Sequence, residues 1–127
     1  MLRPLSTAFD SLATEYDDGF TRTVLGTRLR RAVWRRLDAL FAPGDRVLEL
    51  ACGTGEDALH LGGRGVRVLA TDASPEMVRV AREKVERAGL DGVEVRHLAV
   101  EALDRLDEPP FDGVLSDFGG LNCVADL

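Results

Sequence analysis

The stretch VLELACGTGED, residues 47–57, decides the fold. Its first four residues are mostly apolar and are typical of a buried strand. Gly53 and Gly55 follow at once, and glycine is favoured where a chain takes a positive φ or where a ligand approaches bare backbone. The residues from Glu56 onward have a helical composition. A strand, a glycine loop and a helix in this order predict a site for a nucleotide-type cofactor.

The rest of the chain repeats this alternation of strands and helices. We expect strands over residues 46–50, 66–70, 93–98 and 111–118, and helices over 56–61 and 75–88. Gly62 and Gly63 should end the first helix, while Ser74 should cap the second and Gly89 should end it. The apolar face of the second helix should hold Met77, Ala81, Val85 and Ala88. Strands separated by such helices predict an α/β fold, a Rossmann-like doubly wound parallel sheet with right-handed crossovers.

An arginine-rich segment precedes these elements. It holds six arginines and no acid between Arg22 and Arg36. Apolar residues recur there at four-residue steps, which predicts a helix with one apolar stripe formed by Leu25, Leu29, Val33 and Leu37. Two interpretations stay open. The arginines form a solvated face balanced by acids elsewhere, or they form a basic cap over an anionic substrate or a phosphate-contacting surface.

Composition limits the possible partners. The chain has 127 residues, 45% of them hydrophobic, with a net charge of −6, which predicts a single soluble domain and argues against nucleic acid as the main partner. No apolar run is long enough for a membrane span or a signal peptide, so we expect a cytoplasmic protein without a membrane partner. Cys52 and Cys123 lack metal-ligand spacing and are expected to be free thiols, with no metal site.

The candidate pocket lies where the strands end, because ligands of parallel sheets bind beyond the carboxyl ends of the strands. Small or acidic residues follow each expected strand, at Glu49 with residues 51–55, at Asp72, at 98–100 and at 116–118. Asp72 comes seventeen residues after Gly55 and could accept hydrogen bonds from both ribose hydroxyls. Its other interpretation is an acid favoured by the helix dipole near Ser74.

Charge distinguishes between two cofactor classes. Gly53, Gly55 and Ala58 fit the permissive dinucleotide fingerprint, so an NAD-type oxidoreductase is the alternative. However, acids surround the loop at positions 49, 56 and 57, and no Lys or Arg occurs between Arg46 and Arg64. Such acids repel a pyrophosphate, whereas the ammonium and sulfonium of S-adenosylmethionine are attracted to them. The sequence therefore favours S-adenosylmethionine.

The motifs also resemble a known family. VLELACGTGEDALHL, VLATDASPEM and FDGVLSDFGGLN are similar to the first, second and fourth motifs of class I S-adenosylmethionine-dependent methyltransferases, over Asp45 to Asn122. AFDSLATEYD resembles the lid helix that precedes the core in small-molecule members. The resemblance implies a helical lid or cap over 1–42 and a cofactor-binding core over 43–127. That core would hold four strands, in the order 3-2-1-4, of a normally seven-stranded sheet.

The resemblance further implies methyl transfer from S-adenosylmethionine to a small-molecule acceptor, with S-adenosylhomocysteine as product. A non-catalytic cofactor-binding domain is a second alternative. By this resemblance, Glu49 would approach the cofactor ammonium and Asp72 would hold the ribose. The family commonly has an acid after the third strand that accepts from the adenine amino group, whereas this chain has Ala99 and Val100 there, so we expect the backbone of residues 98–100 to contact the adenine. The full set of cofactor residues that the resemblance implies is Tyr16, Glu49, Ala51, Gly53, Thr54, Gly55, Asp72, Ala73, Met77, Leu98, Ala99, Val100, Ser116 and Asp117.

No catalytic base can be identified from the sequence. His60 falls on a helix and His97 in a strand, and both are expected to be structural. The segment SDFG lacks the Asp/Asn-Pro-Pro-aromatic signature of base amino methylation, which also disfavours nucleic acid. The chain stops after four strands and the start of a further helix. We therefore expect a fragment that is inactive alone and whose fourth strand has a bare edge available for self-association.

Overall fold

The computed structural model describes residues 24–118 and 121–125. A helix, α3 (Val24–Leu40), precedes a five-stranded sheet in the order β3-β2-β1-β4-β5. The strands are β1 (Arg46–Leu50), β2 (Arg67–Asp72), β3 (Val93–His97), β4 (Gly113–Phe118) and β5 (Leu121–Ala125). The connections contain α4 (Glu56–Gly63), α5 (Pro75–Ala88) and the 3-10 helix η2 (Val100–Arg105). Among the described helices, none is both long and apolar enough to cross a bilayer.

The first four strands confirm the parallel sheet and its order. β1 lies at the centre, where Leu48 is in register with Leu69 of β2 and with Val114 of β4. β2 pairs in parallel with β3 on its other side. The carboxyl ends of all four strands therefore meet at one edge, as the candidate pocket requires.

The segment after β4 differs from the expectation. Instead of a helix, β5 turns back and pairs antiparallel with β4, from Phe118 opposite Leu121 to Val114 opposite Ala125. The prediction of a bare edge on the fourth strand was wrong for this structure, because β5 takes up the backbone groups of that edge. Self-association through the edge of β4 loses its physical basis here.

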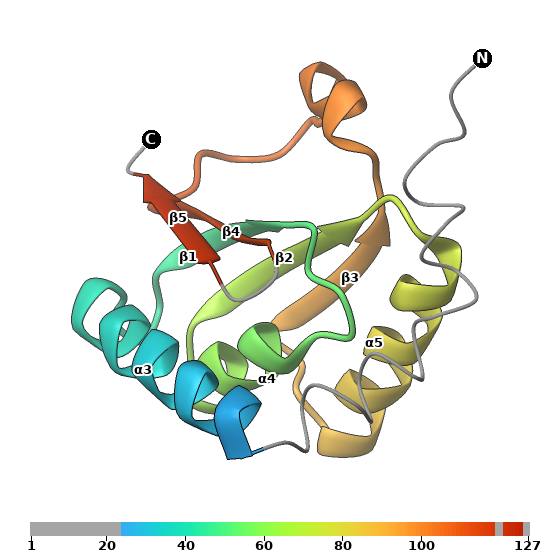
Figure 1. Cartoon of the computed structure of the whole chain (residues 1–127). Coiled ribbons are helices and arrows are strands. Elements are labelled where there is room, and N and C mark those ends of the chain that lie inside the picture. Colours follow the sequence, from blue (N-terminus) through green and yellow to red (C-terminus); the bar gives the residue numbers. More distant parts are fainter. Residues whose placement is uncertain (1–23, 119–120, 126–127) are drawn as a thin grey trace.

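The two faces of the sheet are covered unequally. The three described α-helices all pack against one face, shown as the lower side in Figure 1. Inward side chains of the strands meet those helices in one core, built around Val47, Val68, Ala70, Val95 and Leu115. Over the opposite face the described chain places only η2 and the connection to β4. The described chain thus has the expected parallel sheet, with α-helices on one of the two faces that a doubly wound fold covers.

Helix α4 shows that a glycine can serve packing instead of ending a helix. Gly62 and Gly63 lie inside α4, and the left-handed residue that follows the helix is Gly65, with φ 89°. A Cβ on Gly62 would lie 2.3 Å from Cγ2 of Val93 in β3. The helix does end at Gly63, the second glycine of the predicted pair, but Gly62 lies within it and lets α4 approach the sheet closely.

Helix α5 largely follows its sequence signals. Ser74 caps the helix by accepting a hydrogen bond from the Met77 N–H at 3.2 Å, and Gly89 ends it with φ 66°. Met77, Ala81 and Val85 are buried as expected. Ala88 is exposed, and Val78 takes its place in the buried face.

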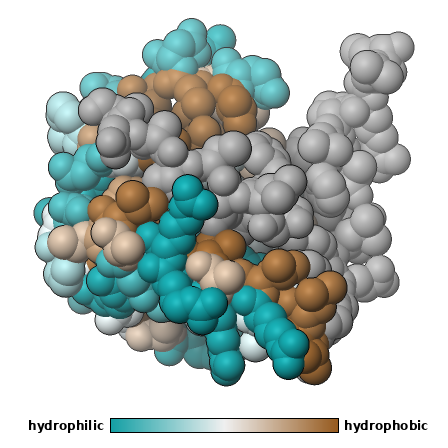
Figure 2. All heavy atoms as spheres, turned by 60° about the vertical axis from the view of Figure 1, so that its left-hand side comes forward, coloured by the Kyte–Doolittle hydropathy of each residue, from teal (hydrophilic) through white to brown (hydrophobic). Residues whose placement is uncertain are grey.

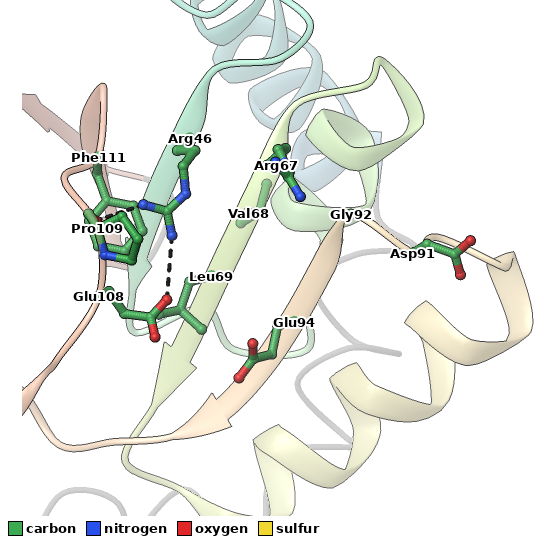
Figure 3. A pocket seen from close by; sticks show the side chains of 10 residues that line it. All are labelled: Arg46, Arg67, Val68, Leu69, Asp91, Gly92, Glu94, Glu108, Pro109 and Phe111. Carbon is green, nitrogen blue, oxygen red and sulfur yellow. Dashed lines mark hydrogen bonds and ion pairs between the residues drawn. The ribbon is translucent and has the colours of Figure 1, made fainter.

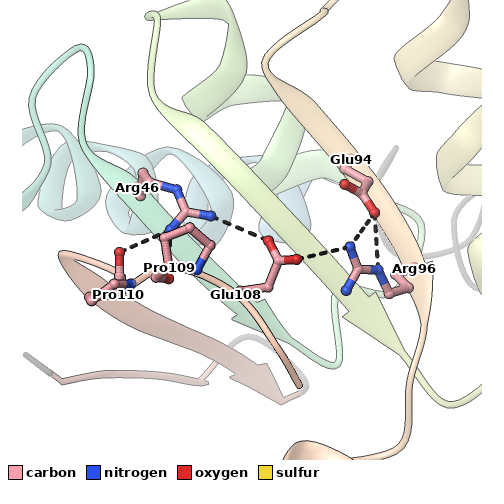
Figure 4. Close-up of polar contacts among 6 residues, drawn as sticks. All are labelled: Arg46, Glu94, Arg96, Glu108, Pro109 and Pro110. Atoms are coloured by element: carbon pink, nitrogen blue, oxygen red, sulfur yellow. Dashed lines mark hydrogen bonds and ion pairs between the residues drawn. The ribbon is translucent and has the colours of Figure 1, made fainter. Parts of the chain in front are cut away.

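A polar network fixes the connection that leads into β4. The Arg46 guanidinium donates to the carbonyl oxygens of Pro109 at 2.6 Å and Pro110 at 2.9 Å. Glu108 bridges Arg46 of β1, at 3.4 Å, and Arg96 of β3, at 3.5 Å (Figure 4). This bridge crosses the face of the sheet opposite the α-helices. These contacts hold the connection against the start of β1.

We predict that Gly62→Ala lowers the free energy of unfolding by about 1–3 kcal/mol, because the new methyl overlaps the stiff Val93 side chain. Gly63→Ala is the matched control, since its Cβ would meet nothing within 4 Å and alanine favours a helix. Urea unfolding of both variants checks this. Equal stability of the two variants would contradict the packing role of Gly62.

Candidate active site

The loop after β1 is built from left-handed residues. Gly53 has φ 58° and Gly55 has φ 89°, which confirms the expectation that glycine takes a positive φ at these positions. Ala51 also has φ 53° and is the single non-glycine residue with positive φ in the described chain. A turn bond from Gly55 N–H to Cys52 O at 3.1 Å closes the loop. No signal in the sequence indicated that Ala51 would share this conformation.

Asp72 fixes this loop from the end of β2. Its Oδ2 accepts from the Gly53 N–H at 2.9 Å, and its Oδ1 accepts from the Ser74 N–H at 2.9 Å. The second bond is the helix-start role that the sequence left open. The first bond joins the glycine loop to β2, and the sequence did not predict it. A carboxylate oxygen can accept more than one hydrogen bond, so these two contacts do not by themselves exclude a ribose contact.

The floor of the loop is buried and acidic. Glu49 is 0% exposed, and its backbone oxygen accepts from the Thr71 hydroxyl at 2.8 Å. Burial raises the pKa of the adjacent Cys52 thiol, and the nearby Glu49 and Asp72 charges raise it further. Cys52 is therefore a neutral, buried thiol, as expected from the sequence. Because the Glu49 carboxylate is enclosed in this structure, its contact with a ligand stays a prediction.

The other expected residues divide into three groups. Ala73 and Leu98 lie half-buried beside Asp72, and the Leu98 N–H donates to the Asp72 carbonyl at 3.0 Å. Met77, Thr54 and Ser116 are buried, whereas Val100 at the start of η2 is exposed. The remaining residues are Ala99, which is half-buried, Asp117, which is placed by its backbone in β4, and Tyr16, which lies outside the described residues.

Two acids that open α4 are paired with distant bases. Glu56 meets Lys84 of α5 at 2.7 Å, and Asp57 meets Arg30 of α3 at 3.0 Å. In the sequence these acids look unopposed, because no base lies near them along the chain. That interpretation was wrong, since the fold supplies a cation to each acid. The acidity of the loop comes from Glu49 and Asp72 instead.

Asp57 is also the first contact of a polar seam between α3 and α4. The Trp34 indole N–H donates to Asp57 Oδ1 at 2.9 Å, and the indole stacks on His60 with ring centroids 4.3 Å apart. His60 and Arg64 then meet Asp38 at 2.7 and 3.0 Å. The structural role expected for His60 is confirmed. The seam itself was missed, although positions 30, 34 and 38 share the four-residue spacing of one helix face.

Two pockets lie away from the loop, on the face of the sheet opposite the α-helices. One, of about 480 Å³, lies among polar side chains that include Arg46, Arg67 and Glu108 (Figure 3). The other, of about 400 Å³, is mainly apolar and is lined by Leu48, Leu50, Leu103, Leu106, Glu108, Pro109, Pro110, Phe111 and Val114. Neither includes a residue of the glycine loop. We assign the candidate site to the loop and the strand ends, where the glycine backbone and the carboxylates of Glu49 and Asp72 lie close together.

The loop fits an adenosyl-type cofactor. A Cβ on Gly53 would meet no atom within 4 Å, so open space lies directly beside its backbone. A carboxylate at the end of β2 borders this loop, and a buried acid lies beneath it. A bare backbone next to acceptor groups suits a ligand with hydroxyl and cationic groups.

Comparisons with known proteins agree with this geometry. A family described as methyltransferase domain matches residues 47–126, so the chain belongs to this family. The resemblance to class I S-adenosylmethionine-dependent methyltransferases is thereby confirmed, and the NAD-type alternative is set aside.

Individual relatives are similar over most of the chain. It is 36% identical to the demethylmenaquinone methyltransferase of Clavibacter sepedonicus, over 94% of this chain and 48% of the relative. It is 32% identical to the ubiquinone/menaquinone biosynthesis C-methyltransferase UbiE of Geotalea daltonii, over 91% of this chain and 51% of the relative. The chain thus spans about half the length of these curated relatives.

Solved structures support the same fold. The complex of DhpI with SAH has a TM-score of 0.62 and 32% identity, over 90% of this chain and 52% of that one. A TehB-like methyltransferase from Corynebacterium glutamicum has a TM-score of 0.64 at 21% identity, over 85% of this chain and 55% of that one. The second likeness shows the fold alone.

We predict that the two loop glycines differ in their tolerance of alanine. Gly53→Ala should cost about 1–2 kcal/mol of stability, the strain of a left-handed alanine with free space around its methyl. Gly55→Ala should cost at least about 1 kcal/mol more, because its Cβ would lie 3.1 Å from the Ala81 Cβ. Chemical unfolding measures both. A smaller loss for Gly55→Ala would contradict the close approach of this loop to α5.

We predict that Trp34→Phe lowers the free energy of unfolding by about 1.5–3 kcal/mol, since it removes a hydrogen bond to the buried Asp57 carboxylate. Arg35→Gln on the exposed side of α3 should change stability by less than about 0.5 kcal/mol. Because Trp34 is the only tryptophan, circular dichroism should follow the unfolding. Equal effects of the two substitutions would show that the seam contributes little.

Proposed function

We propose that the protein binds S-adenosylmethionine and transfers its methyl group to a small-molecule acceptor. The observation that carries this proposal is the left-handed glycine loop tied to the Asp72 carboxylate, within a chain of the methyltransferase-domain family. This arrangement places bare backbone and acceptor oxygens side by side at the carboxyl ends of β1 and β2.

We infer the roles of the residues from the family resemblance together with their positions. Asp72 would accept hydrogen bonds from the ribose hydroxyls while still holding the Gly53 N–H, because each oxygen can accept two. Ala73 and Met77 would flank the adenosine, and the backbone of residues 98–100 would border the adenine. Glu49 would stabilise the cofactor ammonium by its charge, directly or through water. Ser116 and Asp117, at the end of β4, would border the transferred methyl group.

The chemistry asks little of ionisable side chains. The sulfonium of the bound cofactor supplies an already activated methyl group. The chain would align the acceptor in line with that methyl and exclude water from the site. Residues 1–42, of which the structure describes 24–42 including α3, would form the cap over this site. No described histidine is needed as a base, since His60 and His97 are engaged with Asp38 and the Ala73 carbonyl.

Quinol-type rings are the first acceptor class to test. Two relatives of this chain are named for demethylmenaquinone and for ubiquinone/menaquinone biosynthesis. The net charge of −6 disfavours a nucleic acid acceptor. A non-catalytic cofactor-binding role is the second candidate. It would show no turnover even in a longer product that contains this chain, whereas a methyltransferase would release S-adenosylhomocysteine in that assay.

We predict that the chain binds S-adenosylhomocysteine and not NAD in calorimetry, and that Asp72→Asn weakens this binding by about 1.5–3 kcal/mol. Asp91→Asn, at an exposed acid near the start of β3, should leave the affinity unchanged. Preferential binding of NAD would overturn the proposal.

A ligand change tests the ribose contact separately from the loop bond. S-adenosylhomocysteine that lacks its 2′-hydroxyl should bind the original protein more weakly, because Asp72 then loses one donor. In Asp72→Asn the two ligands should differ by much less. If removal of the hydroxyl lowers the ligand affinity of the original protein and of Asp72→Asn equally, Asp72 does not contact the ribose and holds only the loop and the start of α5.

A further inference from the structure

Helix α3 has an inner and an outer side with different chemistry. Arg30 turns inward to Asp57, and Trp34 and Leu37 face the core. The other arginines of α3 are exposed, namely Arg28, Arg31, Arg35 and Arg36. In the described part of the chain, none of these four guanidinium groups forms an ion pair or hydrogen bond with another residue. The inner seam therefore leaves a concentrated positive charge on the outer side.

Apolar side chains share that outer side. The exposed large hydrophobic residues of α3 are Val24 at 71%, Leu25 at 66%, Leu40 at 49% and Leu29 at 40%. Leu25, Leu29 and Leu40 follow one line along the helix, as does Arg36 between them, because their spacings are close to whole turns. Figure 2, which turns the side of α3 toward the viewer, shows hydrophilic and apolar side chains interleaved.

This combination is not explained by packing within the described chain. Outside α3, Val100 is the single further exposed large hydrophobic residue in the described part. The only acid of α3, Asp38, is already engaged by His60 and Arg64. Among residues 24–118 and 121–125, the outer side thus has arginines without counter-charges and leucines without cover, in a chain whose net charge is −6.

We propose that the outer side of α3 docks on an anionic lipid surface, with the helix lying flat among the headgroups. Arginines pair with lipid phosphates at the rim, while Leu25 and Leu29 enter the acyl boundary between them. A nucleic acid would satisfy the arginines but offers no apolar environment for the leucines. A lipid surface satisfies both, so it is the occupant that the two observations together favour.

The charge of the rest of the chain orients this contact. A net-acidic body is repelled by an anionic surface, so α3 would be the side that approaches it. A helix that lies on a membrane needs no span-length apolar run. The expectation of no membrane partner rested on the lack of such a run, and it does not apply to surface docking.

Co-sedimentation of the full chain with vesicles tests the proposal. The chain should bind vesicles of phosphatidylcholine with about 30% phosphatidylglycerol and not vesicles of pure phosphatidylcholine. Because each arginine near the surface contributes about fivefold to partitioning, Arg31→Gln with Arg35→Gln should reduce binding about 25-fold. Arg87→Gln with Arg105→Gln removes two exposed charges from α5 and η2 and should leave binding within about twofold.

The apolar half of the proposal needs its own variant. Leu25→Ser with Leu29→Ser keeps every arginine and should reduce vesicle binding at least fivefold, with unchanged circular dichroism. Loss of binding equally in the Arg87 and Arg105 control would overturn the proposal. The proposal would also be overturned if the leucine substitutions left vesicle binding unchanged and the chain bound heparin equally well. That result would indicate a surface that binds polyanions in general. No binding to anionic vesicles, or dimer formation that the leucine changes abolish, would also overturn it.

Discussion

The Asp72 carboxylate makes the contacts on which the candidate site depends. With one oxygen it holds the Gly53 N–H of the loop after β1, and with the other it holds the Ser74 N–H at the start of α5. Each such bond to a charged group contributes about 1.5–3 kcal/mol. That is enough to offset the strain of about 1–2 kcal/mol at the left-handed Ala51. The loop is therefore held by bonds within the chain, and a loop held in this way loses less conformational entropy when a ligand binds.

Elements with local signals could be predicted from the sequence. The limits of β1 and the capping of α5 follow from neighbouring residues, and the structure places both as expected. Gly62 shows where this reasoning ends. Glycine serves both positive φ and close packing, and only the position of Val93, thirty-one residues along the chain, decides between them. The pairing of β5 with β4 likewise depends on a turn, whereas the glycines after β4 led us to expect the start of a helix.

The electrostatics of the site could not be predicted from a window of sequence. Glu56 and Asp57 look like an unopposed acidic start to α4, yet their partners Lys84 and Arg30 lie 28 and 27 residues away. The cationic cofactor inferred from the acids around the loop agrees with the family of the chain. However, two of those acids, Glu56 and Asp57, are already neutralised by paired bases. The acids that border the glycine loop in space are Glu49 and Asp72, one buried beneath it and one bonded to it.

Helix geometry explains why α3 has two chemistries. A residue repeated every four positions advances about 40° beyond a full turn at each step, so a stripe of four such residues winds around the helix. Leu37 is buried at one end of this stripe, whereas Leu25 and Leu29 have rotated onto the surface beside the arginines. The predicted single apolar stripe is thus divided between core and solvent. Because Arg30 and Trp34 bind Asp57 in the first turn of α4, a contact made on the outer side of α3 acts on a helix already fastened next to the cofactor loop.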